Sequence, residues 1–222
     1  MSIKDRLATQ NYQGFDMDDA QSIIDQIKAA ATEDEQVCPE GGGSKSFMRA
    51  SNNARIVSTS THTGTLHYHP DELVIRARSG TRFRDLQAEV AEQGQFLPFD
   101  PPILGPGSTL GGVVAAGLGG SARPFLGGIR DYVLGAKVVL PTGQVAVFGG
   151  DVMKNVAGYD VSRLMVGSMG SLGMILELAL KVLPAPEATR VFELPMPPAQ
   201  AIKTIELYRR QGGLSGAVFF ED

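Results

Sequence analysis

Three glycine-rich segments contain the residues whose types and spacing point most clearly to chemistry. The longest, residues 101–120, has seven glycines among its twenty residues, and its centre reads Ser-Thr-Leu-Gly-Gly. Similar segments occur at 39–45 and at 167–173. Backbone without side chains can lie directly against a ligand, and its free N–H groups suit phosphate. Three such segments predict one long, phosphate-bearing ligand that is held at several points.

Each segment also has a purely structural explanation, which the sequence leaves open. Gly41 to Gly43 could form a flexible surface turn, although a short strand at 36–38 is predicted just before them. Gly111 and Gly112 could allow close helix packing, and the glycines of 167–173 could serve only as bends.

Elements that would position these segments can be read from hydrophobic periodicity. Asp18–Ala31 is predicted to be a helix, and strands are expected at 55–60, 66–68 and 73–77. The last of these strands has one apolar face and one mostly charged face. Thr81 is predicted to cap a helix over 82–93, which Gly94 ends.

The second half of the chain continues with further short elements. Ser108 or Thr109 is expected to cap a helix that runs through Ala116, and Asp160 to cap another. The remaining expected elements are a hairpin of 132–140 and 144–148, a long strand at 174–182, a strand at 190–194, a helix at 199–210 and a strand at 216–220.

Composition excludes several classes of protein. The chain has 222 residues and a net charge of −4, and it lacks the basic stripe that nucleic-acid binding needs. Its single cysteine, Cys38, allows no disulfide framework and no cysteine-based metal site, so no metal is expected. Cys38 is expected to be a small buried residue rather than a covalent cofactor anchor. A polar N-terminus without a signal-peptide core predicts a cytoplasmic protein.

A Rossmann dinucleotide turn is a weaker explanation of the glycines. Gly117 to Ala122 fits the loose G-x-G-x-x-A pattern. That pattern needs a preceding strand and an acidic residue about twenty positions later. Here a Gly/Ala-rich helix is predicted before it, and the region near Leu140 offers no acid.

The ordered set of motifs resembles the FAD-binding domain of the vanillyl-alcohol oxidase / p-cresol methylhydroxylase type. The set comprises P-x-G-G-G-S-K at 39–45, S-T-L-G-G-x-x-A at 108–115, R-D-Y-V-L-G at 130–135, and G-Y-D-x-x-R-L-M-V-G-S-x-G-x-L-G-x-I at 158–175. Within this family, the run V-M-K-N-V-A-G-Y-D at 152–160 is most similar to the FAD-binding subunits of glycolate oxidase complexes.

The resemblance implies a cofactor, FAD, and specific residues that would hold it. The first loop would hold the pyrophosphate through backbone amides, and the second would lie along the pyrophosphate, ribityl chain and flavin ring. The entry to the long strand would read the adenine side. The implied residues are Gly41, Gly42, Gly43, Ser44, Lys45, Ser108, Thr109, Gly111, Gly112, Gly173 and Ile175. Arg123 and Lys154 are looser candidates for polar contacts.

Two departures from the family pattern bear on the site. Val113 and Met169 stand where the catalytic hydroxy-acid oxidases of the family usually carry Asn and Glu. Those enzymes also use histidines and a metal in a C-terminal domain, whereas the three histidines here, His62, His67 and His69, are expected upstream on strands. The substrate half of the site, and its catalytic residues, are therefore expected outside this chain.

The resemblance implies an α+β fold of two subdomains, residues 1–98 and 99–187, with FAD bound non-covalently between them. Residues 188–222 are expected to begin a truncated C-terminal substrate or cap domain. The implied function is that of a subunit in the flavin-dependent oxidation of a 2-hydroxy acid, alongside a sister flavoprotein subunit and an iron–sulfur subunit. A peripheral position at the inner membrane through these partners is compatible with it. Two alternatives stay open: a flavin-free structural subunit and a free-standing 2-hydroxy-acid oxidase.

Overall fold

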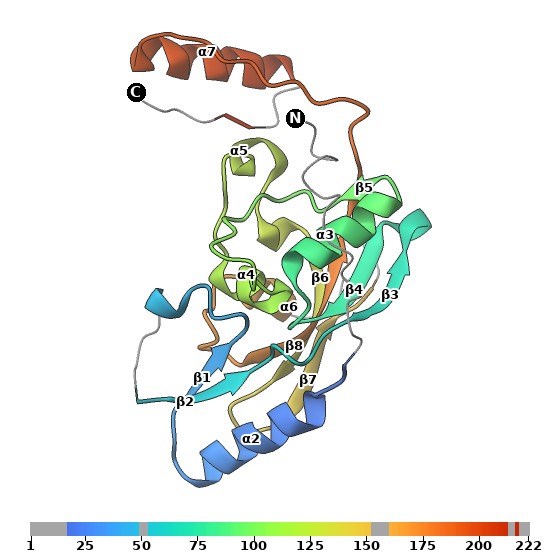
Figure 1. Ribbon diagram of the computed structural model, residues 1–222, viewed down its shortest axis with the longest axis vertical. Helices are drawn as coiled ribbons and strands as arrows, with labels where there is room; N and C mark the ends of the chain where they lie inside the picture. Colours follow the sequence, from blue (N-terminus) through green and yellow to red (C-terminus); the bar gives the residue numbers. More distant parts are fainter. Residues whose placement is uncertain (1–16, 49–52, 152–159, 213–215, 218–222) are drawn as a thin grey trace.

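The computed structural model describes residues 17–48, 53–151, 160–212 and 216–217 (Figure 1). Its helices are α2 (Ala20–Thr32), α3 (Phe83–Glu92), α4 (Leu110–Ala116), α5 (Arg123–Leu126), α6 (Val161–Leu164) and α7 (Pro198–Gln211). Its strands are β1 (Val37–Glu40), β2 (Arg55–Ser58), β3 (Thr65–His69), β4 (Val74–Arg78), β5 (Gln95–Phe96), β6 (Val133–Val139), β7 (Val145–Gly149), β8 (Met174–Lys181) and β9 (Leu183–Pro184).

A five-stranded antiparallel sheet of order β3-β4-β8-β6-β7 forms the centre of the molecule. Its middle strand, β8, is the long strand that hydrophobic alternation predicts at 174–182. The predicted hairpin is β6–β7, and Gly143 occupies its turn with φ +77°. Two smaller sheets accompany the main one: parallel β1–β2 and antiparallel β5–β9. The mixed α+β class expected from the sequence is confirmed.

Helices pack on the sheet in two separate apolar clusters. In Figure 1, α3, α4 and α6 lie together beside the sheet, and the larger cluster joins them to β4, β6 and β8. Phe83, Leu86 and Val90 of α3 are fully buried in it, as the helical spacing predicts. The smaller cluster places α2 against β2, β6 and the start of β8 through Ile23, Ile27 and their neighbours. Burial of these side chains is the main source of stability for such short helices.

The charged face predicted for the strand at 73–77 is present on β4, but it is buried. Arg76 is 9% exposed, and its Nε donates to Asp151 at 2.7 Å. Its Nη1 also lies 3.3 Å from a carboxylate oxygen of Glu177, which accepts from Lys137 Nζ at 2.8 Å through its other oxygen. Pairing of this kind is what allows charged groups to be buried between strands.

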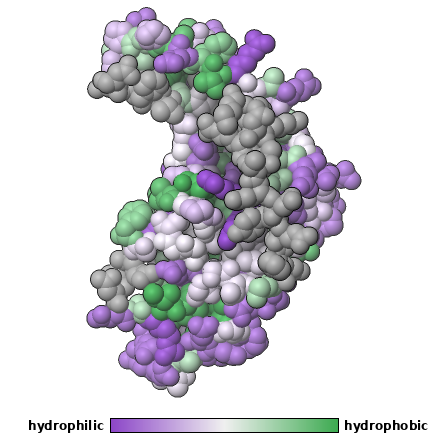
Figure 2. Space-filling view, viewed as in Figure 1, coloured by the Kyte–Doolittle hydropathy of each residue, from purple (hydrophilic) through white to green (hydrophobic). Residues whose placement is uncertain are grey.

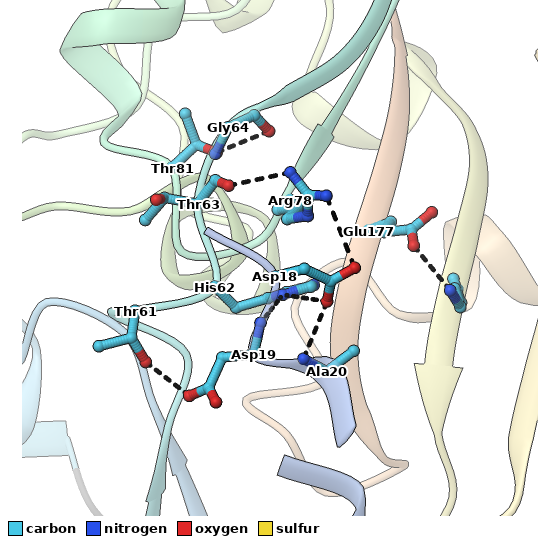
Figure 3. Close-up of polar contacts among 11 residues, drawn as sticks. Asp18, Asp19, Ala20, Thr61, His62, Thr63, Gly64, Arg78, Thr81 and Glu177 are labelled. Carbon is cyan, nitrogen blue, oxygen red and sulfur yellow. Dashed lines mark hydrogen bonds and ion pairs between the residues drawn. The ribbon is translucent and has the colours of Figure 1, made fainter. Parts of the chain in front are cut away.

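The prediction that His62 lies on a strand is wrong, because this residue lies in a turn before β3. The side chain is fully buried, and Figure 3 shows it beside Asp18 at the start of α2. Burial lowers the pKa of His62, so the neutral ring accepts a hydrogen bond at Nδ1 from the backbone N–H of Asp19, at 3.2 Å. The turn thereby anchors α2 next to the end of β4.

The predicted cap of α3 is also wrong. Thr81 Oγ1 accepts a hydrogen bond from the N–H of Gly64 at 3.0 Å, as Figure 3 shows, instead of capping the helix. The helix begins after Arg82, which makes no side-chain cap. The caps predicted for Asp160 and Thr109 are confirmed: each side chain accepts from a backbone N–H three residues later.

The C-terminal segment differs most from expectation. No strand forms at 190–194, although the predicted helix is present as α7. In Figure 1, α7 lies apart from the sheet, and Figure 2 shows hydrophilic and hydrophobic side chains mixed on it. Most of the strand predicted at 216–220 falls outside the described residues, as does the motif at 152–159. The boundary at 98 remains a prediction, and the main sheet takes strands from both sides of it.

Candidate functional site

One pocket lies where the three glycine-rich segments meet. It is lined by the loop after β1, by the ends of β2 and β4, by α4, and by the entry to β8. Segments that are far apart in the sequence therefore form its walls together. Glycines from all three segments, namely Gly41 to Gly43, Gly111, Gly112, Gly170 and Gly173, line this one pocket.

The first glycine loop contacts the second at backbone distance. A Cβ added at Gly42 would overlap the carbonyl oxygen of Gly107, and one at Gly41 would overlap Thr109 Oγ1. The hydroxyl groups of Ser44 and Ser108 lie 3.1 Å apart and share a hydrogen bond. The first loop is thus fixed to the second, and a free surface turn does not describe it.

The second segment is held against β4 in the same way. Gly111 donates its N–H to the carbonyl of Ser79 at 2.7 Å, and a Cβ at Gly111 would come within 2.7 Å of Ser79 Cβ. Thr109 Oγ1 accepts from the N–H of Gly112 at 3.2 Å and so begins α4. Close packing therefore requires glycine at position 111, as the structural alternative supposed, and the same residue also lines the pocket.

Gly112 has no such packing requirement. Outside its own helix backbone, a Cβ there would meet a single atom of the described residues within 4 Å, the side-chain oxygen Thr109 Oγ1 at 3.2 Å. Helix interiors disfavour glycine by about 1 kcal/mol relative to alanine. Packing does not explain this glycine, but close approach of a ligand in the pocket would.

The third segment turns the chain into β8. Gly173 has φ +146°, and a Cβ there would lie 2.8 Å from the carbonyl oxygen of Val139. A Cβ at Gly170 would lie 2.8 Å from the ring of Pro39, which precedes the first loop. The third segment lies against α4, where the N–H of Met169 donates to the carbonyl of Ala115 at 2.9 Å, and it completes the pocket wall there.

The structure places ten of the eleven residues proposed from the sequence around this pocket. They are Gly41, Gly42, Gly43, Ser44, Lys45, Thr109, Gly111, Gly112, Gly173 and Ile175. Ser108 does not line the pocket: it is buried, and its hydroxyl group is bonded to that of Ser44, which does. Of the two looser candidates, Arg123 does not line the pocket, and Lys154 lies outside the described residues.

Sequence reasoning missed several residues of the pocket wall. Thr59 and Ser79 follow the ends of β2 and β4, and both are buried. The other missed residues are Pro39, Glu40, Ser46, Met48, Ala115, Ala116, Met169, Gly170 and Met174. Small polar residues near the ends of two predicted strands were a weak signal, because the sequence does not show which strand ends meet.

The two positions that depart from the family pattern behave differently. Val113 is 1% exposed and packs in the main core, so it does not reach the pocket. Met169 lines the pocket, with a left-handed backbone at φ +52°. Cys38 is partly exposed on β1, which corrects the expectation that it is buried, and it does not line the pocket.

Lys45 is the one cation among the described residues that line the pocket. Burial lowers its pKa, because the partly enclosed ammonium is less well hydrated. An anion at this place would offset that cost. Glycine backbone, hydroxyl groups and a single cation fit a ligand that joins phosphates to a large, mostly uncharged ring system such as that of FAD.

Comparisons with known proteins agree with this chemistry. Residues 16–149 match the family model described as FAD binding domain. Glycolate oxidase subunit GlcE of Escherichia coli is 39% identical over 206 residues, which cover 92% of this chain and 59% of that protein. D-lactate dehydrogenase of Anaerostipes hadrus is 39% identical over 133 residues, covering 60% of this chain and 28% of the relative.

A solved structure of alkyldihydroxyacetonephosphate synthase superposes with a TM-score of 0.61 at 26% identity, covering 76% of this chain and 31% of that one. The chain thus spans less than two thirds of these relatives. Within the described ranges, no helix has both the length and the apolar character needed to cross a membrane. The match over more than half of its length shows that the chain belongs to the FAD-binding domain family, with FAD as its cofactor.

Proposed function

We propose that the protein is the FAD-binding subunit of a glycolate oxidase-type complex and takes part in the oxidation of a 2-hydroxy acid to a 2-oxo acid. The observation that carries the proposal is the convergence on one pocket of ten residues that come from three segments far apart in the sequence. The 39% identity to a glycolate oxidase subunit supports the choice of substrate class. FAD, when bound, supplies the two-electron acceptor for this chemistry.

Each wall of the pocket has a proposed task in holding FAD. Backbone N–H groups of Gly41 to Gly43 and the ammonium of Lys45 face the pyrophosphate. Thr109, Gly111 and Gly112 leave space beside it for the ribityl chain and ring. Gly173 and Ile175 present main-chain groups to the adenine side. In this proposal, these walls hold the cofactor non-covalently.

The proposed setting is a complex with a sister flavoprotein subunit and an iron–sulfur subunit. The relative that is 39% identical over 92% of this chain is itself named a subunit, which supports assembly into a larger enzyme. In this setting the protein is cytoplasmic, or held at the inner membrane through its partners. No residue of this chain is proposed to be catalytic.

The first experiment is the visible absorption spectrum of the purified protein before and after incubation with FAD and desalting. We expect retained flavin bands and a 1:1 ratio of FAD to protein. The variant Gly112→Leu should fold, because leucine favours helix and meets only a side-chain atom, but it should lose FAD. Ala91→Leu, at an exposed position of α3, is the matched control and should retain FAD.

The outcomes separate the proposal from its alternatives. A wild-type protein that neither carries nor accepts FAD would favour a flavin-free structural subunit. Full binding of FAD by Gly112→Leu would show that the cofactor lies elsewhere. Turnover of glycolate by this protein alone would favour a free-standing oxidase.

A further inference from the structure

Ser79 occupies a fixed position in the pocket wall. It directly follows β4 and is fully buried, yet it belongs to the lining of the pocket. Its N–H donates to the carbonyl of Leu176 in β8 at 2.7 Å, and its own carbonyl accepts from Gly111 of α4 at 2.7 Å. Both backbone groups are thus held by elements on either side, so the side chain has little freedom to move away.

The hydroxyl group of Ser79 has no hydrogen-bond partner within the described residues. Three buried residues in or behind the pocket wall have paired hydroxyl groups. Thr59 donates to the carbonyl of Glu40 at 3.4 Å, Thr109 accepts from Gly112 at 3.2 Å, and Ser108 is bonded to Ser44. A buried hydroxyl without a partner is destabilising, and folded proteins rarely leave one.

We infer that the missing partner is the cofactor, and that Ser79 Oγ donates a hydrogen bond to an oxygen of bound FAD. Phosphate and ring carbonyl oxygens of FAD are acceptors, and a serine hydroxyl can donate to either. Ser79 is therefore a positioning residue of the pocket. This inference rests on the proposed cofactor site, and it adds a residue that glycine-rich motifs could not reveal.

Two measurements on Ser79→Ala separate a ligand contact from a structural role. Titration of the apo-protein with FAD, followed by flavin fluorescence, should show a Kd about tenfold weaker than that of the wild type. Thermal unfolding of the apo-protein should show an unchanged or higher Tm, since the substitution removes an unpaired buried hydroxyl at no cost in contacts.

Ser162→Ala is the matched control. Ser162 is equally buried, but its hydroxyl donates to Asp160 at 2.9 Å, and it does not line the pocket. This variant should lower the Tm of the apo-protein and leave the Kd for FAD unchanged.

Three results would overturn the inference. If Ser79→Ala bound FAD with wild-type affinity, the Ser79 hydroxyl group would not contact the cofactor. A drop in apo Tm that accompanies the weaker binding would assign Ser79 a structural role. Failure of the wild-type protein itself to bind FAD would refute the whole proposed site, and Ser79 with it.

Discussion

The first and third glycine segments look alike in sequence, but Gly42 of the first and Gly167 of the third are glycines for different reasons. In the first, Gly42 lies so close to Gly107 that a side chain would overlap backbone. In the third, Gly167 has no atom within 4 Å of an added Cβ in the described part of the chain, and its glycine is explained by φ +80° alone. The first segment also carries a cation, Lys45, whereas residues 167–173 carry no charge.

This difference separates two uses of glycine in one binding site. In the first loop, absence of a side chain allows two distant backbones to touch and leaves N–H groups facing the pocket. At Gly167, freedom of the backbone lets the chain reverse after α6. Substitutions in the two segments should therefore affect binding and stability in different proportions.

Gly42→Ala should have the largest effect. The methyl group would push the first loop away from Gly107, so we expect a loss of about 3 kcal/mol in the free energy of unfolding, with FAD binding abolished. Chemical denaturation and flavin absorbance measure the two effects. Gly43→Ala is the control: it adds backbone strain at φ +68° but no overlap, so it should cost about 1 kcal/mol. Equal effects of the two variants would contradict the proposed loop contact.

Lys45→Met should weaken FAD binding without weakening the fold. Burial lowers the pKa of Lys45, so the charged form destabilises the folded apo-protein at every pH below that lowered pKa. Methionine removes this cost, and the apo-protein should be as stable as the wild type or more so. Loss of the cation should raise the Kd for FAD about tenfold.

The affinity for FAD should also change with pH, because only the charged form of Lys45 attracts the phosphates. Wild-type affinity for FAD should fall as pH rises through the pKa of Lys45, which burial lowers from its ordinary value of 10.5. Lys45→Met should lack that decline, and Lys203→Met, at an exposed position of α7, should keep it. The same alkaline decline in Lys45→Met would place the titrating group elsewhere.

Gly167→Ala should have the smallest effect. Only the left-handed backbone opposes the substitution, so about 1 kcal/mol of stability is lost while the Kd for FAD stays within twofold. Gly167→Asn should lose less, because asparagine tolerates this conformation better. A large loss of FAD affinity in either variant would mean that the third segment holds the cofactor as tightly as the first does.

Local patterns were sufficient to predict much of the fold and most of the pocket. Periodicity located the central strand at 174–182 and the helices α2 and α3 within two residues, and the resemblance of the ordered motifs to a known family located ten of the pocket residues. Contacts between segments that are far apart in the sequence could not be predicted from local patterns. Thr81 bonds to Gly64 instead of capping α3, and Ser79 meets Gly111, because of how strands and turns come together in three dimensions.

The position of β8 also has a consequence for the order in which the molecule folds. Arg76 of β4 pairs with Ala179 of β8, and the neighbouring strand β6 pairs with β8 as well. Contacts between residues about a hundred positions apart slow folding, because a long loop must close before they form. During synthesis on the ribosome, the edges of β4 and β6 that pair with β8 therefore stay unpaired until β8 has been made. Unpaired edges of this kind invite association with other chains, so a molecular chaperone should increase the yield of this protein most while β8 is still being made.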